Sequence, residues 1–295
     1  MSVCKTESGA ATLGQVYRKG RRALSQAGVD SPGFDADCLF QKAFGLDRQN
    51  RILRDDQPAE PEKTEQYLCD IRARAEGTPL QYLLGKWPFL DLELRVGEGV
   101  LIPREETELL VRTAAELLQR VAAPRIIDLC SGTGAVALGL STLLPSAKIT
   151  AAELYSGAYS YLTRNVAETG LSHVEPVQLD VLAPESAQCY SEWDGIVSNP
   201  PYVRTDELPT LQREVRREPV TALEGGADGL LFYRAIAQNW LPRLKPGGVV
   251  AVEIGEQQAQ EVSALFRTQG ITQIRVHRDF NGLERVVCGI KGEKC

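Results

Sequence analysis

The chain has 295 residues, of which 43 % are hydrophobic and 24 % are charged, and its formal net charge is −6. This length allows one large domain, or a large and a small one, with enough core to fold without disulfides or a structural metal. An acidic balance argues against direct DNA binding, because proteins that hold duplex DNA through its phosphates are usually basic.

Residues 1–84 are predicted to form a small all-helical domain. Apolar residues recur at helical spacing over 13–29, with basic residues between them. A second helix is expected to begin near Pro32 and to end at Gly45. A third is expected over 61–76. Because all of its predicted elements are helices, the stretch is assigned as a small separate domain.

Residues 85–103 change character and predict a β-hairpin linker. Apolar residues partly alternate with polar ones between Trp87 and Val96, as in a half-buried strand pair. Gly97 and Gly99 supply a turn. A helix is then expected over 105–121, where acidic residues in the first turn suit the helix dipole.

From residue 124 onward, strands and helices alternate along the chain, which predicts a doubly wound α/β sheet. We therefore expect residues 104–295 to form one domain. Seven strands are predicted, at 125–129, 148–153, 175–179, 193–198, 249–254, 274–278 and 284–290. The helices between them are predicted at 135–144, 156–169, 228–242 and 256–269.

A loop containing two glycines follows the first strand of this sheet. Gly132 and Gly134 lack Cβ atoms, so the backbone can turn tightly and approach a ligand closely. The next helix offers free N–H groups. Glu153, at the end of the second strand, can accept hydrogen bonds from both hydroxyls of a ribose. The same pattern matches a dinucleotide fingerprint, so the loop alone leaves NAD and S-adenosylmethionine both open as cofactors.

A further carboxylate ends the third predicted strand. Asp180 lies at the edge of the sheet that faces the ligand crevice in doubly wound folds. Together with the adjacent apolar Val181 it could hold an adenine. An ordinary turn or N-cap aspartate explains the same residue, and both interpretations stay open.

The deciding motif follows the fourth strand and reads Asn199-Pro200-Pro201-Tyr202. Two prolines fix φ near −65° and remove two backbone donors, which stiffens the segment. The Asn199 side-chain oxygen and the Pro200 carbonyl oxygen can both accept hydrogen bonds from a planar NH₂ group. Tyr202 can lie flat against that group.

This arrangement suits methyl transfer to an amide or amino nitrogen. An amide nitrogen is a poor nucleophile because its lone pair is delocalised into the carbonyl group. Two acceptors that bind its hydrogens concentrate electron density on nitrogen and orient it toward an activated methyl group. Holding both reactants in near-attack geometry can contribute roughly 7–11 kcal/mol. An NAD-linked oxidoreductase has no use for such a motif.

These residues carry a family resemblance over nearly the whole chain. Asn199 to Tyr202 resembles the motif of amino-methyltransferases, and the segment from about 124 looks like a class I, Rossmann-like methyltransferase fold with a seven-stranded sheet. The whole chain resembles the HemK/PrmC family of protein-(glutamine-N5) methyltransferases. The further matching segments are Thr78-Pro79-Leu80-Gln81-Tyr82-Leu83-Leu84-Gly85, Phe89, Val100-Leu101-Ile102-Pro103-Arg104-Glu105-Glu106-Thr107-Glu108, Asp279, Gly282 and Arg285.

The resemblance implies a function and a set of site residues. The enzyme would use S-adenosyl-L-methionine to methylate the glutamine of the GGQ motif in class 1 peptide chain release factors, and the helical domain would help to dock the release factor. The implied catalytic residues are Asn199, Pro200 and Tyr202, and Pro201 joins them in binding substrate. The implied cofactor-binding residues are Asp128, Cys130, Ser131, Gly132, Thr133, Gly134, Glu153, Asp180, Val181 and Asn199.

The chain departs from the family pattern at four positions. Cys130 stands where the family often has glycine, and Glu153 is one methylene longer than the usual aspartate. Glu105 stands where proline is common. Val181 stands where an aromatic residue is common, and it can cover an adenine but cannot stack on it.

Three other functions remain as alternatives: a DNA adenine methyltransferase, a glutamine methyltransferase acting on a ribosomal protein, and an NAD-linked oxidoreductase. The first lacks a basic face and a target-recognition domain. The basic cluster Arg213, Arg216 and Arg217 is either a solvated face or a contact to an acidic partner or RNA.

The remaining features indicate a cytoplasmic protein without a metal. A monomer is expected, although none of these features determines the oligomeric state. No two of the seven cysteines lie within four positions of each other, so there is no CxxC motif, and reduced thiols are expected. His173 and His277 are too far apart in sequence to suggest a metal site. There is no secretory signal, and no apolar run approaches the about 20 residues of a membrane helix.

Overall fold

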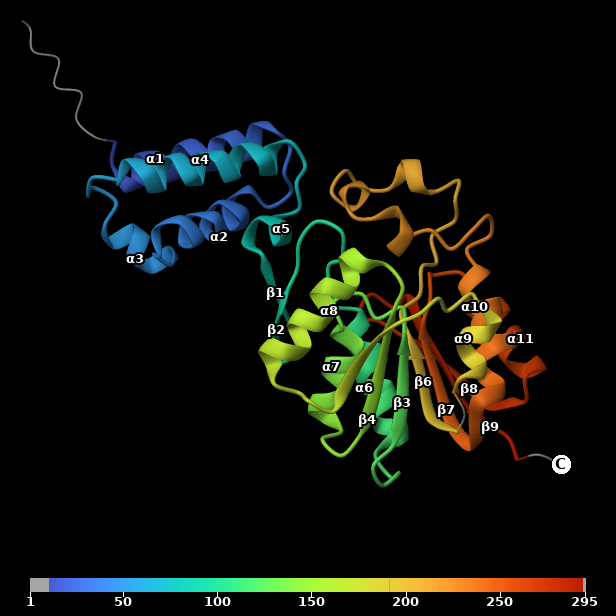
Figure 1. The fold of residues 1–295 in the computed structure, drawn as a ribbon. Helices are drawn as coiled ribbons and strands as arrows, with labels where there is room; N and C mark the ends of the chain where they lie inside the picture. Colours follow the sequence, from blue (N-terminus) through green and yellow to red (C-terminus); the bar gives the residue numbers. More distant parts are fainter. Residues whose placement is uncertain (1–10, 191, 294–295) are drawn as a thin grey trace, which may run out of the picture. The chain divides into compact units, whose positions relative to one another are not determined.

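The computed structural model describes residues 11–190 and 192–293, and the chain divides into two compact units between Gly85 and Lys86. The first unit consists of helices and the second contains the sheet (Figure 1). Each unit is described by itself.

The described part of the first unit, residues 11–85, contains five helices and confirms the predicted helical character of this part of the chain. Thr12 and Gln15 form a capping box at the start of the first helix, and Gly45 ends the second with φ 69°. Leu39, Phe40 and Tyr67 are fully buried between the helices. The helices are α1 (Leu13–Gln26), α2 (Pro32–Phe44), α3 (Arg48–Leu53), α4 (Pro61–Ala75) and α5 (Leu80–Leu84).

The second unit contains the predicted seven-stranded sheet, which confirms the α/β fold class. The strand order is β5-β4-β3-β6-β7-β9-β8, and all neighbouring strands are parallel except at β9, which is antiparallel to both neighbours. The strands are β3 (Arg125–Leu129), β4 (Lys148–Glu153), β5 (Val174–Gln178), β6 (Trp193–Ser198), β7 (Leu244–Glu253), β8 (Ile271–Arg278) and β9 (Glu284–Lys291).

Helices cover both faces of the sheet and create two apolar cores (Figure 1). One core includes Leu110, Leu138 and Leu162 from three helices on the first face. The other includes Trp240 and Phe266. The first-face helices are α6 (Thr107–Leu118), α7 (Ala135–Leu143) and α8 (Ser156–Thr169), and the second-face helices are α9 (Pro184–Gln188), α10 (Leu231–Ala235) with a π-helical turn (Ile236–Trp240), and α11 (Ala259–Thr268).

The predicted hairpin is present and is part of the second unit. Strands β1 (Lys86–Phe89) and β2 (Leu92–Arg95) pair in antiparallel fashion. The Arg95 N–H donates to Asn165 Oδ1 at 2.7 Å, and the Arg95 guanidinium forms an ion pair with Glu168 at 2.7 Å. The hairpin is thereby attached to α8. Among the described residues, no helix is both long and apolar enough to cross a membrane.

The sheet order places several loops at one edge. β3 lies between β4 and β6, so the chain reverses its direction of winding at this strand. In doubly wound sheets, ligands bind outside the carboxyl ends of the strands at such a switch point. The loops that follow β3, β4, β5 and β6 are therefore the place to look for a site.

Candidate functional site

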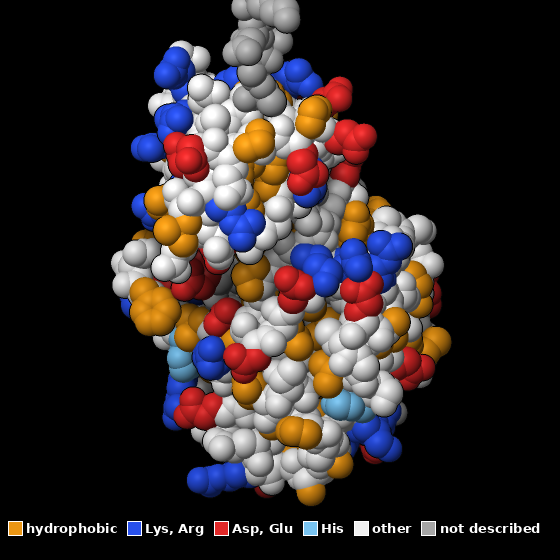
Figure 2. All heavy atoms as spheres, turned by 90° about the vertical axis from the view of Figure 1, so that its left-hand side faces the viewer, with side chains coloured by type: hydrophobic (Ala, Val, Ile, Leu, Met, Phe, Trp, Pro, Cys, Tyr) orange, Lys and Arg blue, Asp and Glu red, His pale blue; other side chains and the backbone are white. Residues whose placement is uncertain are grey.

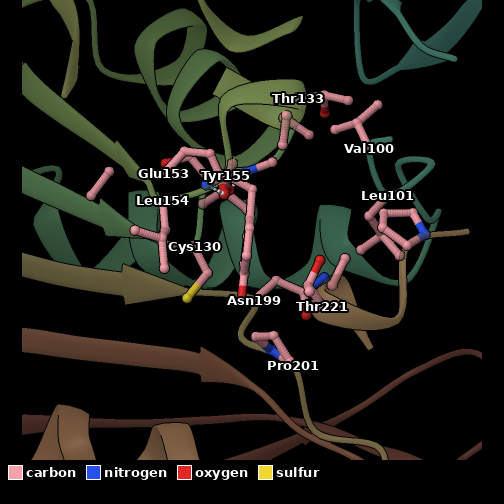
Figure 3. A pocket seen from close by; sticks show the side chains of 18 of the residues that line it. Val100, Leu101, Cys130, Thr133, Glu153, Leu154, Tyr155, Asn199, Pro201 and Thr221 are labelled. Atoms are coloured by element: carbon pink, nitrogen blue, oxygen red, sulfur yellow. Dashed lines mark hydrogen bonds between the residues drawn. The ribbon is translucent and has the colours of Figure 1, made fainter. Parts of the chain in front are cut away.

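A cavity of about 200 Å³ opens at this edge of the sheet and lies within the second unit. Loops after β3, β4, β5 and β6 form its walls, together with the segment 99–104 and the start of α6. Pro219, Thr221 and Ala222, from the long connection after β6, also line it. Figure 3 shows Cys130, Glu153, Asn199 and Pro201 around this space, although they come from the ends of three different strands and the loops that follow them.

The loop after β3 turns through three residues with positive φ: Cys130 at 61°, Gly132 at 55° and Gly134 at 85°. A Cβ atom on Gly134 would lie 2.7 Å from the Leu162 Cδ1 atom, so this position requires glycine for space as well as for conformation. Cys130, Ser131, Gly132 and Thr133 line the cavity, whereas Gly134 lies behind them at the N-cap of α7. The loop predicted from the sequence thus forms a wall of the cavity, except for Gly134, which allows the turn into α7.

The Glu153 carboxylate is fixed by backbone donors. Its Oε2 atom accepts the Gly132 N–H at 2.9 Å, and its Oε1 atom accepts the Tyr155 N–H at 2.9 Å. Burial raises the pKa of Glu153, and these backbone hydrogen bonds oppose the rise. The side chain lines the cavity, so it can offer its remaining lone pairs to hydroxyl groups there.

Asp128 does not line the cavity. Its side chain is completely buried at the base of the loop, where Oδ2 accepts the Ala137 N–H at 3.2 Å. Oδ1 is buried and has no hydrogen-bond partner. Burial raises the pKa of Asp128 to about 7. This residue, expected from the resemblance to bind cofactor, anchors the first turn of α7 instead of forming the wall.

We expect the stability contributed by Asp128 to decrease as pH rises. Its pKa is about 7 in the folded protein and about 3.9 in an unfolded chain. The unfolded state therefore loses this proton at lower pH, so the contribution is complete below about pH 4 and is lost as pH rises through about 7. We measure the unfolding free energy of Asp128→Asn and of wild type by urea denaturation at pH 5 and at pH 8. The value for the variant minus the value for wild type should be larger at pH 8 than at pH 5. An equal difference at both pH values would contradict this assignment.

Asp180 and Val181 both line the cavity, at the end of β5. The Asp180 Oδ1 atom accepts the Leu182 N–H at 2.8 Å, which is the turn geometry that the sequence left open beside ligand binding. The Val181 carbonyl oxygen accepts the Trp240 Nε1–H at 3.0 Å. Both residues are thus held rigidly at the wall.

The segment after β6 is divided between the cavity and the protein interior. Asn199 and Pro201 line the cavity, whereas Pro200 and Tyr202 do not. The Tyr202 hydroxyl donates to Glu253 Oε1 at 3.4 Å, and burial raises the Tyr202 pKa. The Asn199 Nδ2–H donates to Thr107 Oγ1 at 3.1 Å. The Asn199 carboxamide thus lines the same cavity as Glu153, with its nitrogen bound to Thr107.

Four polar residues of the site received no individual role from the sequence. Thr107 donates to Glu253 Oε2 at 2.7 Å. Glu218 accepts the Ile102 N–H at 2.9 Å and forms an ion pair with Arg104, which ties the connection after β6 to the cavity wall. Thr107 and Arg104 belong to the segment 100–108 already singled out by resemblance. Glu253 could have been suspected, because it ends a strand as Glu153 does.

Neither the surface charge (Figure 2) nor the described side chains point to a nucleic-acid or metal site. On the face shown in Figure 2, Lys and Arg side chains lie among Asp and Glu side chains and do not form one continuous basic surface. Arg216 and Arg217 lie in a short 3₁₀ turn of the connection after β6. In the described part of the chain, no group of three or more His, Cys, Asp and Glu residues is arranged to hold a metal ion.

Comparison with known proteins gives consistent matches. The PrmC N-terminal domain family matches residues 15–85, and the Methyltransferase small domain family matches residues 105–229. A release factor glutamine methyltransferase of Moorella thermoacetica is 36 % identical over 285 residues, covering 96 % of this chain and 100 % of the relative. The protein of the same name from Geobacter sulfurreducens is 37 % identical and covers 94 % of this chain and 96 % of the relative.

Solved structures include similar proteins. The release factor-specific protein-(glutamine-N5) methyltransferase of Alicyclobacillus acidocaldarius is 29 % identical, with a TM-score of 0.42, covering 68 % of this chain and 99 % of that chain. The hMettl16 catalytic domain, solved with an RNA hairpin, has a TM-score of 0.56 at 15 % identity and covers 80 % of this chain and 83 % of that one. The second likeness concerns the fold alone.

Proposed function

Because this chain belongs to the family of release factor glutamine methyltransferases, we propose that it methylates the side-chain nitrogen N5 of the glutamine in the GGQ motif of class 1 peptide chain release factors, and so modulates translation termination. S-adenosyl-L-methionine is the proposed cofactor. The observation that carries the proposal is the position of Asn199, whose carboxamide lines the same cavity as the glycine loop and Glu153.

The cavity fits the proposed cofactor. Glu153, fixed by two backbone N–H groups, is suited to accept the two hydroxyls of a ribose. Asp180 and Val181 line the cavity and would hold the adenine, and the Cys130–Thr133 segment, which also lines it, would contact the remainder of the cofactor. The bound cofactor supplies a methyl group on a positively charged sulfur atom, which makes that methyl electrophilic.

The residues of the motif after β6 would orient the substrate. The Asn199 Oδ1 atom and the Pro200 carbonyl oxygen would accept the two N–H groups of the glutamine amide, which directs the nitrogen lone pair toward the methyl group. Holding the two reactants in this geometry lowers the activation free energy of the transfer. The nitrogen would form its bond to the methyl carbon as the carbon–sulfur bond breaks, so that S-adenosylhomocysteine leaves as a neutral thioether and the positive charge moves to nitrogen. The nitrogen would then release one proton to water. A strong general base is not required, because the charged nitrogen is acidic.

Tyr202 would support this geometry from behind the cavity wall. Its hydroxyl bonds to Glu253, and its carbonyl oxygen accepts the Gln258 Nε2–H at 3.0 Å. Both contacts stabilise the turn that carries Asn199. The stacking of Tyr202 against the substrate amide stays a prediction, and these contacts add a supporting role to it.

The partner is proposed to be the release factor, with the helical unit contributing to its docking. We propose that the chain acts as a cytoplasmic monomer, without DNA as a substrate and without a metal. The net charge of −6 supports a protein substrate over a nucleic acid.

A methylation assay tests this function. The purified full chain is incubated with S-adenosyl-L-methionine and a class 1 release factor whose GGQ glutamine is unmodified. We expect a gain of one methyl mass, about 14 Da, on the GGQ peptide, and fragmentation should place it on the glutamine. A ribosomal protein mixture and adenine-containing DNA serve as competing substrates. Methylation of either in preference to the release factor would refute the proposal.

A second assay tests the cofactor. Thermal denaturation is followed with S-adenosylhomocysteine and with NAD. Stabilisation by S-adenosylhomocysteine alone is expected, because a ligand that binds only the folded state raises its stability. Stabilisation by NAD alone would favour an oxidoreductase.

A further inference from the structure

We propose that Thr107 and Glu253 are positioning residues that fix which way the Asn199 carboxamide faces, so that its oxygen, and not its nitrogen, is presented to the substrate amide. This inference rests on the proposed function and assigns roles to two residues outside the Asn-Pro-Pro-Tyr motif. Neither residue is required to contact the reacting atoms.

The three side chains form a continuous hydrogen-bonded chain. The Asn199 Nδ2–H donates to Thr107 Oγ1 at 3.1 Å, and the Thr107 hydroxyl donates to Glu253 Oε2 at 2.7 Å. Thr107 is the first residue of α6 and is 3 % exposed, and Glu253 is the last residue of β7 and is 2 % exposed. Water therefore has little access to compete for these bonds.

Which group donates and which accepts in these two hydrogen bonds follows from the number of available protons. A threonine hydroxyl has one proton to donate, and an ionised carboxylate has none. With Glu253 ionised, the Thr107 proton goes to Glu253, so the Thr107 oxygen can only accept. Its partner on Asn199 must then be the NH₂ group.

This direction decides the chemistry at the cavity. The oxygen and nitrogen of a carboxamide have nearly the same shape, so only their partners determine the rotamer. With the nitrogen bound to Thr107, Oδ1 is the end available to the substrate. A flipped Asn199 would present N–H groups to the N–H groups of the glutamine amide, and binding would be repulsive.

Groups on several elements determine whether Glu253 is ionised. Burial raises the pKa of Glu253 to about 7, and Glu106 beside α6 adds to the rise. The hydroxyls of Thr107 and Tyr202 and the charge of Arg285 on β9 oppose it. The Tyr233 hydroxyl of α10 donates to the Glu253 backbone oxygen at 2.8 Å. Arg285 is itself held by an ion pair with Asp279 at 2.9 Å.

The test compares Thr107→Val, which removes the hydroxyl, with Thr107→Ser, which keeps it. Thr113→Val is the matched control, because Thr113 is also buried in α6 but does not line the cavity. On the release factor, Thr107→Val should lower kcat about 10- to 100-fold, the scale on which misplacement of reacting groups acts. Thr107→Ser should restore most of it, and Thr113→Val should keep wild-type kcat. The dissociation constant for S-adenosylhomocysteine should change little in all three.

A double-mutant cycle separates positioning from a merely structural role. If Thr107 acts only through Asn199, Thr107→Val should have no further effect on kcat in an Asn199→Ala background. Multiplicative losses would overturn the inference. Glu253→Gln provides a second variant if Thr107→Val does not fold, because its amide no longer dictates the direction of the Thr107 hydroxyl. Its kcat should also fall, and again only when Asn199 is present.

The outcomes distinguish this inference from the function on which it rests. If the wild-type chain does not methylate the release factor, the proposed function fails and this inference fails with it. If the wild type methylates it and Thr107→Val and Glu253→Gln retain wild-type kcat, only the inference fails.

Discussion

Replacement of Asn199 with alanine is expected to lower kcat for release factor methylation about 10²- to 10³-fold, by analogy with the loss of one aligned hydrogen-bonding group from an oxyanion hole. Asn199 lines the cavity, and its Nδ2 is already bonded to Thr107, so its oxygen is the group proposed to meet the substrate amide. Alanine removes that acceptor, whereas the glycine loop and Glu153 do not depend on it. Affinity for S-adenosylhomocysteine should therefore change much less than kcat.

Single-turnover kinetics with saturating cofactor and release factor measure this effect directly. Asn281→Ala is a matched control, because Asn281 is exposed in the turn between β8 and β9. Thermal denaturation of both variants checks that the fold is intact. Retained turnover in a folded Asn199→Ala protein would remove the role assigned to this residue.

Replacement of Glu153 with alanine is expected to produce the largest loss of cofactor affinity. The change removes the carboxylate proposed to accept the ribose hydroxyls. It also leaves the N–H groups of Gly132 and Tyr155 without their acceptor, which loosens the glycine loop. A hydrogen bond to a charged group contributes about 1.5–3 kcal/mol, so the dissociation constant should rise about 10- to 100-fold or more.

Isothermal titration with S-adenosylhomocysteine provides the measurement. Glu153→Gln is the informative companion variant, since it keeps one oxygen acceptor and nearly the same volume. Its dissociation constant should lie between those of wild type and Glu153→Ala. A Glu153→Ala protein that binds S-adenosylhomocysteine as tightly as wild type would contradict the proposed ribose site.

The sheet could be predicted from sequence because its signal is local. Buried parallel strands form short apolar runs, and the helices between them are long enough to show periodicity. The short helices were harder to predict. Helix α3 has six residues and α5 has five, which is less than two turns each, so the spacing of apolar residues shows no helical period. The helix expected over 228–242 begins only at Leu231, continues as a π-helical turn and ends in a 3₁₀ turn over Leu241–Arg243.

The candidate site could be predicted only in part, for a different physical reason. The glycine loop and the Asn-Pro-Pro-Tyr segment are each made of consecutive residues, and Glu153 is recognisable because it ends a predicted strand. Their functional groups could therefore be identified from local sequence. The hydrogen bonds that link Asn199, Thr107 and Glu253 could not be identified in this way. Asn199 and Thr107 are 92 positions apart, and Thr107 and Glu253 are 146 positions apart. Only the packing of α6 against the sheet brings them together.

Asp128 shows how the burial of a strand end decides the role of its side chain. It is the last but one residue of β3, and the resemblance assigned it to the cofactor. Its side chain is completely buried and accepts the N–H of Ala137. Sequence position placed it beside the site, but only the fold could show that it does not line the cavity. A contact between Asp128 and the cofactor stays a prediction.

The central claim is that the turn after β6 receives a flat NH₂ group and directs its nitrogen at an activated methyl group. A crystal structure with S-adenosylhomocysteine and a glutamine-containing GGQ peptide tests it most directly. We predict that the glutamine amide nitrogen donates to both Asn199 Oδ1 and the Pro200 carbonyl oxygen and faces the sulfur atom of the cofactor product. A peptide amide bound elsewhere, or a turn directed away from that sulfur, would contradict the account.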